Sequence, residues 1–259
     1  TVDACRSVIS LNYYQLFPSF KDLFKVANEG NKEMIFVKPA RNEVGYGNWF
    51  TAGALPPAFK STSQITEFAY TTSMANFATQ YRLRSAFVNS LAANDLRRSL
   101  IVTSYTNQSN QTIDLMATPD NARSFKYWDN GTLGNDSGND IPVIRYADIL
   151  LSLAEALNEL NGPAQESLDL INQVRTRAGI NNLTLADAST KDVLRDLILR
   201  ERGWEFISEG KRREDLIRQG KFISMAQSRG LNAKATQVLF PIPQAEIDAN
   251  KLAVQNNGY

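Results

Sequence analysis

Apolar side chains recur at helical spacing between residues 142 and 160 of this 259-residue chain. The recurring positions are Val143, Ala147, Leu150, Ala154 and Leu157. Because they follow one another at steps of three and four residues, they form one stripe along a helix. Pro142 suits the first turn of such a helix, and Gly162 predicts its end.

A second apolar stripe runs through residues 164–178 and stops at Gly179. The two helices are joined by about three residues, so they are expected to pack antiparallel. A third helix is predicted to begin near Thr190, whose hydroxyl suits the N-cap position, with Asp192 favourable in the first turn. The helical pair spans roughly 36 residues, close to the period of a tetratricopeptide repeat.

The pattern therefore predicts a mainly α-helical fold, a tetratricopeptide-like helical repeat scaffold with long irregular loops and minor β elements. In the first half of the chain, residues 1–30 are predicted to be helical and residues 33–39 to form a short strand. Residues 74–91 carry another apolar helical stripe. Residues 103–118 are predicted to be extended, with polar turns.

Residues 40–57 mix glycines, prolines and aromatic residues without helical or strand period, and so predict a long loop. An ordered loop of this length is often functional. An aromatic ring can stack on the C–H face of a sugar, while amide and guanidinium groups bind its hydroxyls. The residues of this loop that supply such groups are Arg41, Tyr46, Asn48 and Trp49. The same aromatic residues would equally suit anchors that hold the loop on its own core.

A second irregular stretch, residues 127–140, is rich in Asn, Asp and Gly, which favour tight turns. Trp128 either contributes to a sugar platform or caps the core. The density of oxygen ligands suggests calcium, but Gly131 would occupy the third ligand position and no Glu closes the loop. Turn formation is therefore favoured, and no metal site is predicted.

Two carboxylates, Glu201 and Glu205, lie four residues apart on the third helix, a spacing that suits an acid/base pair for glycoside hydrolysis. Arginines flank them in the sequence: Arg200, Arg202, Arg212 and Arg213. Carboxylates near guanidinium groups usually form ion pairs that hold helices together. Structural ion pairing is therefore the favoured interpretation, and catalysis is the alternative.

The composition removes several classes of function. The chain has 28 basic and 27 acidic residues and a net charge of +1, so nothing favours nucleic acid or acidic lipid. It has no histidine, which removes His-based nucleophilic catalysis and His-ligated zinc. No phosphate-binding or dinucleotide fingerprint is present, and no cofactor is predicted. A single cysteine, Cys5, excludes an internal disulfide framework.

A series of motifs follows in one order through the second half of the chain. They are VIRYADILL (143–151), AEALNE (154–159), INQVRTRAG (171–179), ILRER (198–202), EGKR (209–212), DLIRQG (215–220), FPIP (240–243) and the terminal QNNGY (255–259). This order resembles the C-terminal region of the SusD/RagB family. The specific resemblance covers residues 141–259, and a looser one extends upstream through residues 33–37, 95–99 and 125–127.

The resemblance implies a division into residues 1–140, a variable part with ligand-binding loops, and residues 141–259, the helical region. Full members are longer, so we expect this chain to be the C-terminal portion of one. The family implies a non-catalytic lipoprotein on the surface of the outer membrane, with its lipid anchor outside this segment. It would bind oligosaccharide or polysaccharide and deliver it to a SusC-like TonB-dependent transporter. The alternatives are a protein-binding helical repeat scaffold and a carboxylate-dependent glycoside hydrolase.

Overall fold

A computed structural model describes residues 1–77 and 80–259. The chain divides into two compact units, Thr1–Glu209 and Gly210–Tyr259. The division expected at residue 140 falls inside the first unit, because segments from both sides of it pack together there. Strand β1 (Met34–Lys38), for example, pairs with β7 (Ile141–Arg145).

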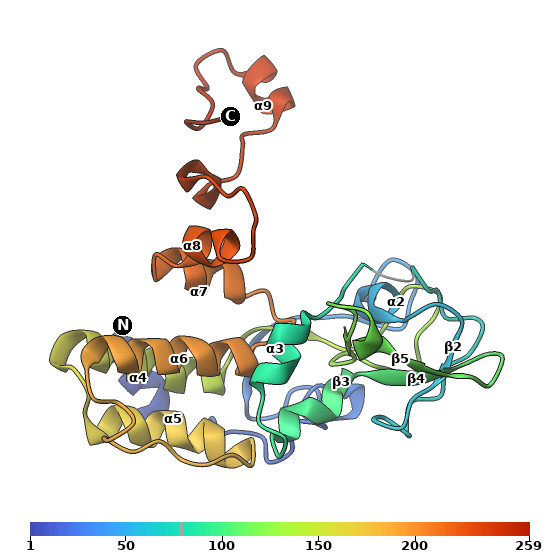
Figure 1. Ribbon diagram of the computed structural model, residues 1–259, viewed down its shortest axis with the longest axis horizontal. Coiled ribbons are helices and arrows are strands. Elements are labelled where there is room, and N and C mark those ends of the chain that lie inside the picture. Colours follow the sequence, from blue (N-terminus) through green and yellow to red (C-terminus); the bar gives the residue numbers. More distant parts are fainter. Residues whose placement is uncertain (78–79) are drawn as a thin grey trace. The chain divides into compact units, whose positions relative to one another are not determined.

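The helical layer of the first unit is built around α4 (Tyr146–Asn161), which packs against α1 (Val2–Ser10), α5 (Gln165–Arg177) and α6 (Lys191–Glu205) (Figure 1). The predicted apolar stripe lies inside, since Ala147, Leu150 and Ala154 are all buried. Gly162 ends α4 with a φ of +78°. The backbone N–H of Val193 donates to the Thr190 hydroxyl at 3.2 Å. These contacts confirm the three predicted helices and the Thr190 cap.

The start predicted for the first of these helices is wrong. Residues 141–145 form strand β7, in which Pro142 lies opposite Val37 in an antiparallel pair, and α4 begins only at Tyr146. Pro142 is tolerated because this sheet has only two strands and therefore consists of edges. The strand predicted over residues 33–39 is confirmed as β1.

The remaining strands form two small sheets. Strands β2 (Phe59–Ser61), β4 (Ser104–Asn107) and β5 (Thr112–Asp114) make a three-stranded antiparallel sheet, which confirms the extended region predicted over residues 103–118. Strands β3 (Ile101–Val102) and β6 (Arg123–Ser124) pair separately. A core rich in aromatic residues underlies these sheets and includes Phe59, Tyr105 and Phe125.

Two helical predictions are wrong over most of their length. In residues 1–30, α1 ends at Ser10, and the following backbone turns at Asn12, whose φ is +51°. Pro18 limits helix propagation there, and the only regular element that follows is the short 3-10 turn η1 (Val26–Asn28). The buried apolar residues of this stretch lie in turns and not in a helix.

Among the described residues of 74–91, helix is confined to α3 (Ser85–Ser90). The backbone N–H groups of Phe77 and Tyr81 donate to the carbonyls of Ala52 and Gly53, at 2.8 and 3.1 Å. Pairing with the loop therefore replaces helix there, while residues 78–79 lie outside the described part. The stretch predicted as a loop, residues 40–57, contains the short helix α2 (Phe50–Ala54), so that prediction is wrong over these five residues. The other short elements are η2 (Leu96–Leu100) and η3 (Leu115–Ala117).

The second unit contains α7 (Arg212–Arg218), α8 (Phe222–Gln227), η4 (Ala235–Val238) and α9 (Gln244–Ala249). Arg213 organises it, because its guanidinium carbon lies 4.0 Å from the ring centre of Phe240 and its Nη2 donates to the Val238 carbonyl at 2.9 Å. Throughout residues 1–77 and 80–259, every helix is too short or too polar to cross a bilayer.

Candidate functional site

Residues 40–57, which include α2, and the irregular residues 127–140 are joined to each other by several hydrogen bonds. Asn48 and Ser137 exchange two backbone hydrogen bonds of 2.9 and 3.0 Å. The Asn48 side chain also donates to the Asn139 carbonyl at 2.7 Å, and the Thr51 hydroxyl donates to the Tyr127 carbonyl at 2.6 Å. The second stretch therefore braces the first.

Asp136 fixes the tip of the first stretch. Its Oδ1 accepts hydrogen bonds from the backbone N–H of Gly47 and from the indole Nε1–H of Trp49, both at 3.1 Å. Gly47 is required at this point, because a Cβ there would lie 2.4 Å from the Asp136 Cα. This close approach lets one carboxylate hold both the backbone and the indole ring.

Four exposed rings gather around this tip and are called the aromatic surface below. They are Tyr46, Trp49, Phe77 and Tyr81, with 67, 54, 40 and 45% of their surface exposed. The ring centres of Trp49 and Phe77 are 6.2 Å apart, and Tyr81 stacks on Phe50 at 5.0 Å. Leaving several neighbouring aromatic rings exposed to water is unfavourable. A group of such rings on the surface therefore indicates a binding site.

The structure brings three of the predicted residues together at this tip. Trp49 and Tyr46 are exposed, and the backbone N–H of Arg41 donates to the Tyr46 carbonyl at 3.0 Å. The Arg41 side chain is exposed, and its guanidinium makes no hydrogen bond to the described residues. Arg41 thus presents an exposed guanidinium from the same stretch as Tyr46 and Trp49.

The other two predicted residues are placed differently. Asn48 uses its amide within the loops, since its Oδ1 also accepts from the Phe50 N–H at 3.1 Å. Trp128 has only 7% of its surface exposed and packs on Phe68 with ring centres 6.0 Å apart. Its assignment as a sugar platform is therefore corrected, and the alternative interpretation, a cap on the core, describes it.

Sequence analysis did not include Phe77 and Tyr81 in the candidate site, because their spacing suited the apolar stripe of a helix. The sequence around them argued against a helix, because this stretch of Thr, Ser, Asn and Gln offers few other apolar residues for a helix to bury. A helix with so little to bury depends on tertiary packing for its stability.

The turn interpretation of residues 127–140 is supported by the contacts of Asp129. Its Oδ1 accepts from the Gly131 N–H at 2.8 Å, and its Oδ2 accepts from the Gly138 N–H at 2.9 Å and from the Asn42 side chain. Its oxygens are thus occupied by N–H donors that hold the loop in shape.

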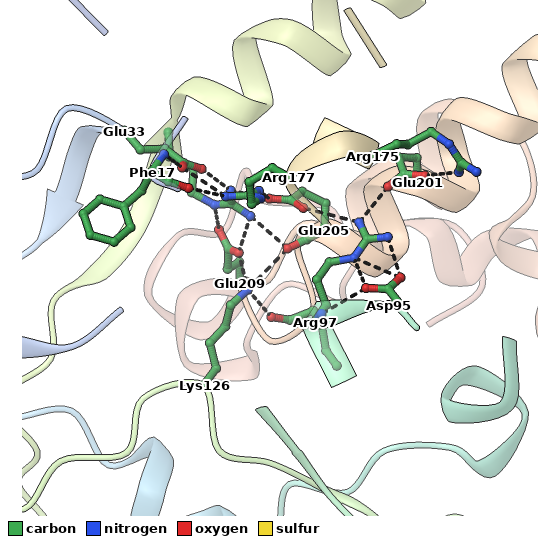
Figure 2. Close-up of polar contacts among 12 residues, drawn as sticks. Phe17, Glu33, Asp95, Arg97, Lys126, Arg175, Arg177, Glu201, Glu205 and Glu209 are labelled. Atoms are coloured by element: carbon green, nitrogen blue, oxygen red, sulfur yellow. Dashed lines mark hydrogen bonds and ion pairs between the residues drawn. The ribbon is translucent and has the colours of Figure 1, made fainter. Parts of the chain in front are cut away.

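The two carboxylates of α6 lie in a buried charge cluster of five cations and five anions (Figure 2). The members are Arg97, Lys126, Arg145, Arg175 and Arg177 with Glu33, Asp95, Glu201, Glu205 and Glu209. Glu201 accepts from Arg97 at 2.6 Å and from Arg175 at 2.7 Å. Glu205 accepts from Arg97, Arg145 and Arg177.

This geometry confirms ion pairing, although the partners come from distant segments rather than from the flanking arginines. Arg202 instead pairs with Asp148 at 2.8 Å, and Arg200 lies over the Trp204 ring. Burial alone would raise the pKa of Glu205, but the charges of Arg177, Arg145 and Arg97 outweigh it and hold that pKa well below its ordinary value. A fully buried, ionised carboxylate of this kind cannot act as an acid on a polysaccharide.

Burial outweighs the neighbouring charges in its effect on the pKa of Lys126. Its ammonium donates to Glu209 and, at 2.9 Å, to the Ile207 carbonyl, and it lies 4.3 Å from the ring centre of Phe24. Burial lowers the pKa of Lys126 to about 8, with Glu209 partly opposing the shift. The cluster thus connects β7, α5 and α6 to the non-helical segments that contain Glu33, Asp95 and Lys126.

A family model, described as the SusD family, matches residues 12–259. The chain belongs to the SusD family. SusD-like protein P25 of Formosa agariphila is 29% identical over an alignment that covers 100% of this chain and 55% of P25. The starch-binding protein SusD of Bacteroides thetaiotaomicron is 32% identical over 46% of this chain and 22% of its own length.

Solved structures, among them one of a SusD superfamily protein, share the fold. One from Parabacteroides distasonis superposes with a TM-score of 0.76 at 27% identity, over 100% of this chain and 56% of that one. Surface glycan-binding protein A of Bacteroides thetaiotaomicron, in complex with laminarihexaose, gives 0.72 at 23% identity, over 99% of this chain and 58% of its own. The chain therefore spans a little over half the length of these proteins.

Proposed function

We propose that this SusD-family chain binds oligosaccharide or polysaccharide without chemically changing it. The observation that carries the proposal is the aromatic surface, in which Trp49 is exposed yet held by Asp136. A ring fixed before binding loses little entropy when a sugar stacks on it. Tyr46 and Arg41, joined by a backbone hydrogen bond of 3.0 Å in the same stretch, supply a phenol and a guanidinium for the sugar hydroxyls.

The relatives support this ligand class. One is named a starch-binding protein, and another was determined with laminarihexaose, a glucose oligomer. The absence of catalysis is supported from within this chain, because both carboxylates of the hydrolase alternative are enclosed in ion pairs, with 0–1% of their side chains exposed. Their oxygens are therefore committed to the fold.

The wider role follows from the family. We propose that the protein acts at the outer-membrane surface, attached by a lipid anchor outside this segment, and delivers its glycan to a SusC-like TonB-dependent transporter. The α4–α5 pair, joined by only three residues, would be one hairpin of a tetratricopeptide-like scaffold that supports the loops. Under this proposal the helical layer is structural and the loops bind the ligand.

Calorimetric titration with a panel of oligosaccharides, including laminarihexaose and maltohexaose, tests the proposal. We expect Trp49→Ala to weaken the parent's best ligand about tenfold, equivalent to ~1.4 kcal/mol. Tyr13→Ala is the matched control, because Tyr13 is also an exposed ring, at 58%, but lies outside the aromatic surface. Equal binding by the parent and Trp49→Ala would refute the site, and no binding to any member of the panel would refute the ligand class.

A further inference from the structure

A hollow of about 710 Å³ lies in the first unit, and none of its lining residues belongs to the aromatic surface. Apolar side chains make up much of its wall, among them Pro18, Leu96 and Ile101. Leu96 leaves 56% of its surface exposed, although it is a large apolar residue. A pocket of this size, with apolar walls and a few polar groups, is typical of a site for a small molecule.

Arg98 lines this hollow and is held in place by the end of α3. It is half-buried, and its Nη1 donates to the carbonyls of Val88 and Leu91 at 2.9 and 3.1 Å. The other N–H groups of its guanidinium make no hydrogen bond to residues 1–77 or 80–259. Because the two carbonyls carry no net charge, they fix the guanidinium without neutralising it.

The other charged side chains that line the hollow are already neutralised. The Lys21 ammonium donates to both carboxylate oxygens of Glu67, at 2.8 and 2.9 Å. The two carboxylate oxygens of Asp95 accept from Arg97 at 2.7 and 2.9 Å. Among the described residues that line the hollow, Arg98 is therefore the one whose charge is uncompensated.

Most of the uncharged polar side chains of the hollow are also engaged within the chain. The side chains of Ser19, Gln64, Asn94 and Ser99 donate to Asp22, Thr103, the Gly179 carbonyl and the Leu96 carbonyl, at 2.6, 3.3, 2.7 and 2.7 Å. Few N–H and O–H groups therefore remain to pair with the hydroxyls of a sugar, and leaving those hydroxyls unpaired would be costly. The wall favours a ligand whose body is apolar.

We propose that this hollow, called the Arg98 pocket below, binds a small carboxylate that has an apolar body. The planar guanidinium matches the two oxygens of a carboxylate, and Leu96 and Pro18 cover the apolar part. Covering Leu96 also removes its exposed apolar surface from water. A free carboxylic acid and the C-terminal leucine of a short peptide share this chemistry. The pocket is independent of the proposed glycan binding, because it uses no ring of the aromatic surface.

Matched probes that differ only at the carboxylate test the charge requirement. One pair is 3-phenylpropionate and 3-phenylpropionamide, and the other is N-acetyl-glycyl-leucine and its C-terminal amide. In NMR titrations we expect the parent to bind at least one of the carboxylates about tenfold more tightly than its amide. The pair with the larger preference distinguishes a free acid from a peptide C-terminus. Equal binding of carboxylate and amide in both pairs, or no binding of either carboxylate, would overturn the proposal.

Substitution of the arginine assigns the preference to its guanidinium. We expect Arg98→Met to reduce the preference for the carboxylate to about twofold or less. Arg98→Lys keeps the charge but not the planar fork, so it should retain part of the preference. A preference that survives unchanged in Arg98→Met would place the carboxylate elsewhere and overturn the proposal.

A second variant leaves Arg98, and with it the end of α3, untouched. Ala93 lines the pocket, so Ala93→Phe should fill part of it and weaken the carboxylate and the amide alike, by about tenfold. Ala92→Phe is the matched control, because Ala92 is also exposed but does not line the pocket. Binding at the parent's level in Ala93→Phe, or an equal loss in Ala92→Phe, would refute the pocket even if Arg98→Met fails to fold.

The variant of the aromatic surface separates this proposal from the proposed function. We expect Trp49→Ala to bind the carboxylate probe as the parent does, and Arg98→Lys to bind the parent's best oligosaccharide unchanged. Loss of carboxylate binding in Trp49→Ala would place that ligand on the aromatic surface and overturn the Arg98 pocket. Carboxylate binding by a parent that binds no oligosaccharide would support the pocket while rejecting the glycan proposal.

Discussion

The indole N–H of Trp49 and the backbone N–H of Gly47 share one acceptor, Oδ1 of Asp136, at 3.1 Å each. The carboxylate belongs to residues 127–140, whereas both donors belong to residues 40–57. A residue on one loop therefore sets the direction of the ring that the other loop exposes. Asp136 itself is 4% exposed, so a ligand on the ring does not have to displace it.

From this relationship we predict that Asp136→Ala weakens glycan binding although Asp136 is buried below the ring. Losing the acceptor frees the indole to rotate and leaves the Gly47 N–H without its partner, so affinity should fall about tenfold. Asp136→Asn is the matched control, because its amide oxygen can still accept, and we expect it to stay within about threefold of the parent. Iodide quenching of tryptophan fluorescence should increase in Asp136→Ala. Unchanged affinity in that variant would show that the ring needs no support.

The helical framework was predictable because the signals that specify each helix lie within the helix itself or next to it. The stripe through Ala147, Leu150 and Ala154 and the glycine at 162 act within a few residues of each other, so local spacing suffices. The start of α4 was not predictable in this way. Pro142 is compatible with a helical first turn, and only its pairing with Val37, from a strand far away in the sequence, places it in β7.

The sequence indicated which types of side chain the candidate site would use, but not which residues belong to it. Trp49 and Tyr46 stand out in a loop without period, whereas Trp128 looks the same in sequence and is buried. What separates them is the core of Phe68 and Phe125 beneath Trp128, which no local pattern reveals. Phe77 joins the surface through a backbone hydrogen bond to Ala52, a contact that exists only once the loops have folded.

The charge cluster leads to a prediction about stability. Arg145 is 1% exposed and donates to Glu33, Glu205 and Glu209, so removing it leaves three buried carboxylates short of a partner. We expect Arg145→Met to lower the free energy of unfolding by about 3–5 kcal/mol, measured by denaturation in guanidinium chloride. Arg6→Met should change it little, because the pair of Arg6 with Glu166 is exposed. A loss of similar size in both variants would argue against a special role for burial.

Acid should weaken the fold through the same cluster. The pKa of Glu205 in the folded chain lies well below its ordinary 4.5, because its arginine partners outweigh the effect of burial. The unfolded chain therefore takes up a proton at this carboxylate first as pH falls, and the unfolded state gains relative to the folded one. The stabilisation is complete above the unfolded pKa and is lost as pH falls from there toward the folded pKa.

We therefore predict that the free energy of unfolding falls between about pH 5 and pH 3, and that Glu205→Gln, which cannot titrate, shows a shallower fall. Glu159→Gln is the control for an exposed carboxylate, because Arg195 lowers the pKa of Glu159 to about 2 at a site where solvent screens the interaction. Denaturation curves at a series of pH values measure the slopes. If Glu205→Gln and the parent lost stability in parallel while Glu159→Gln did not, the acid sensitivity would belong to the surface pair, and the cluster would be insensitive to acid in this range.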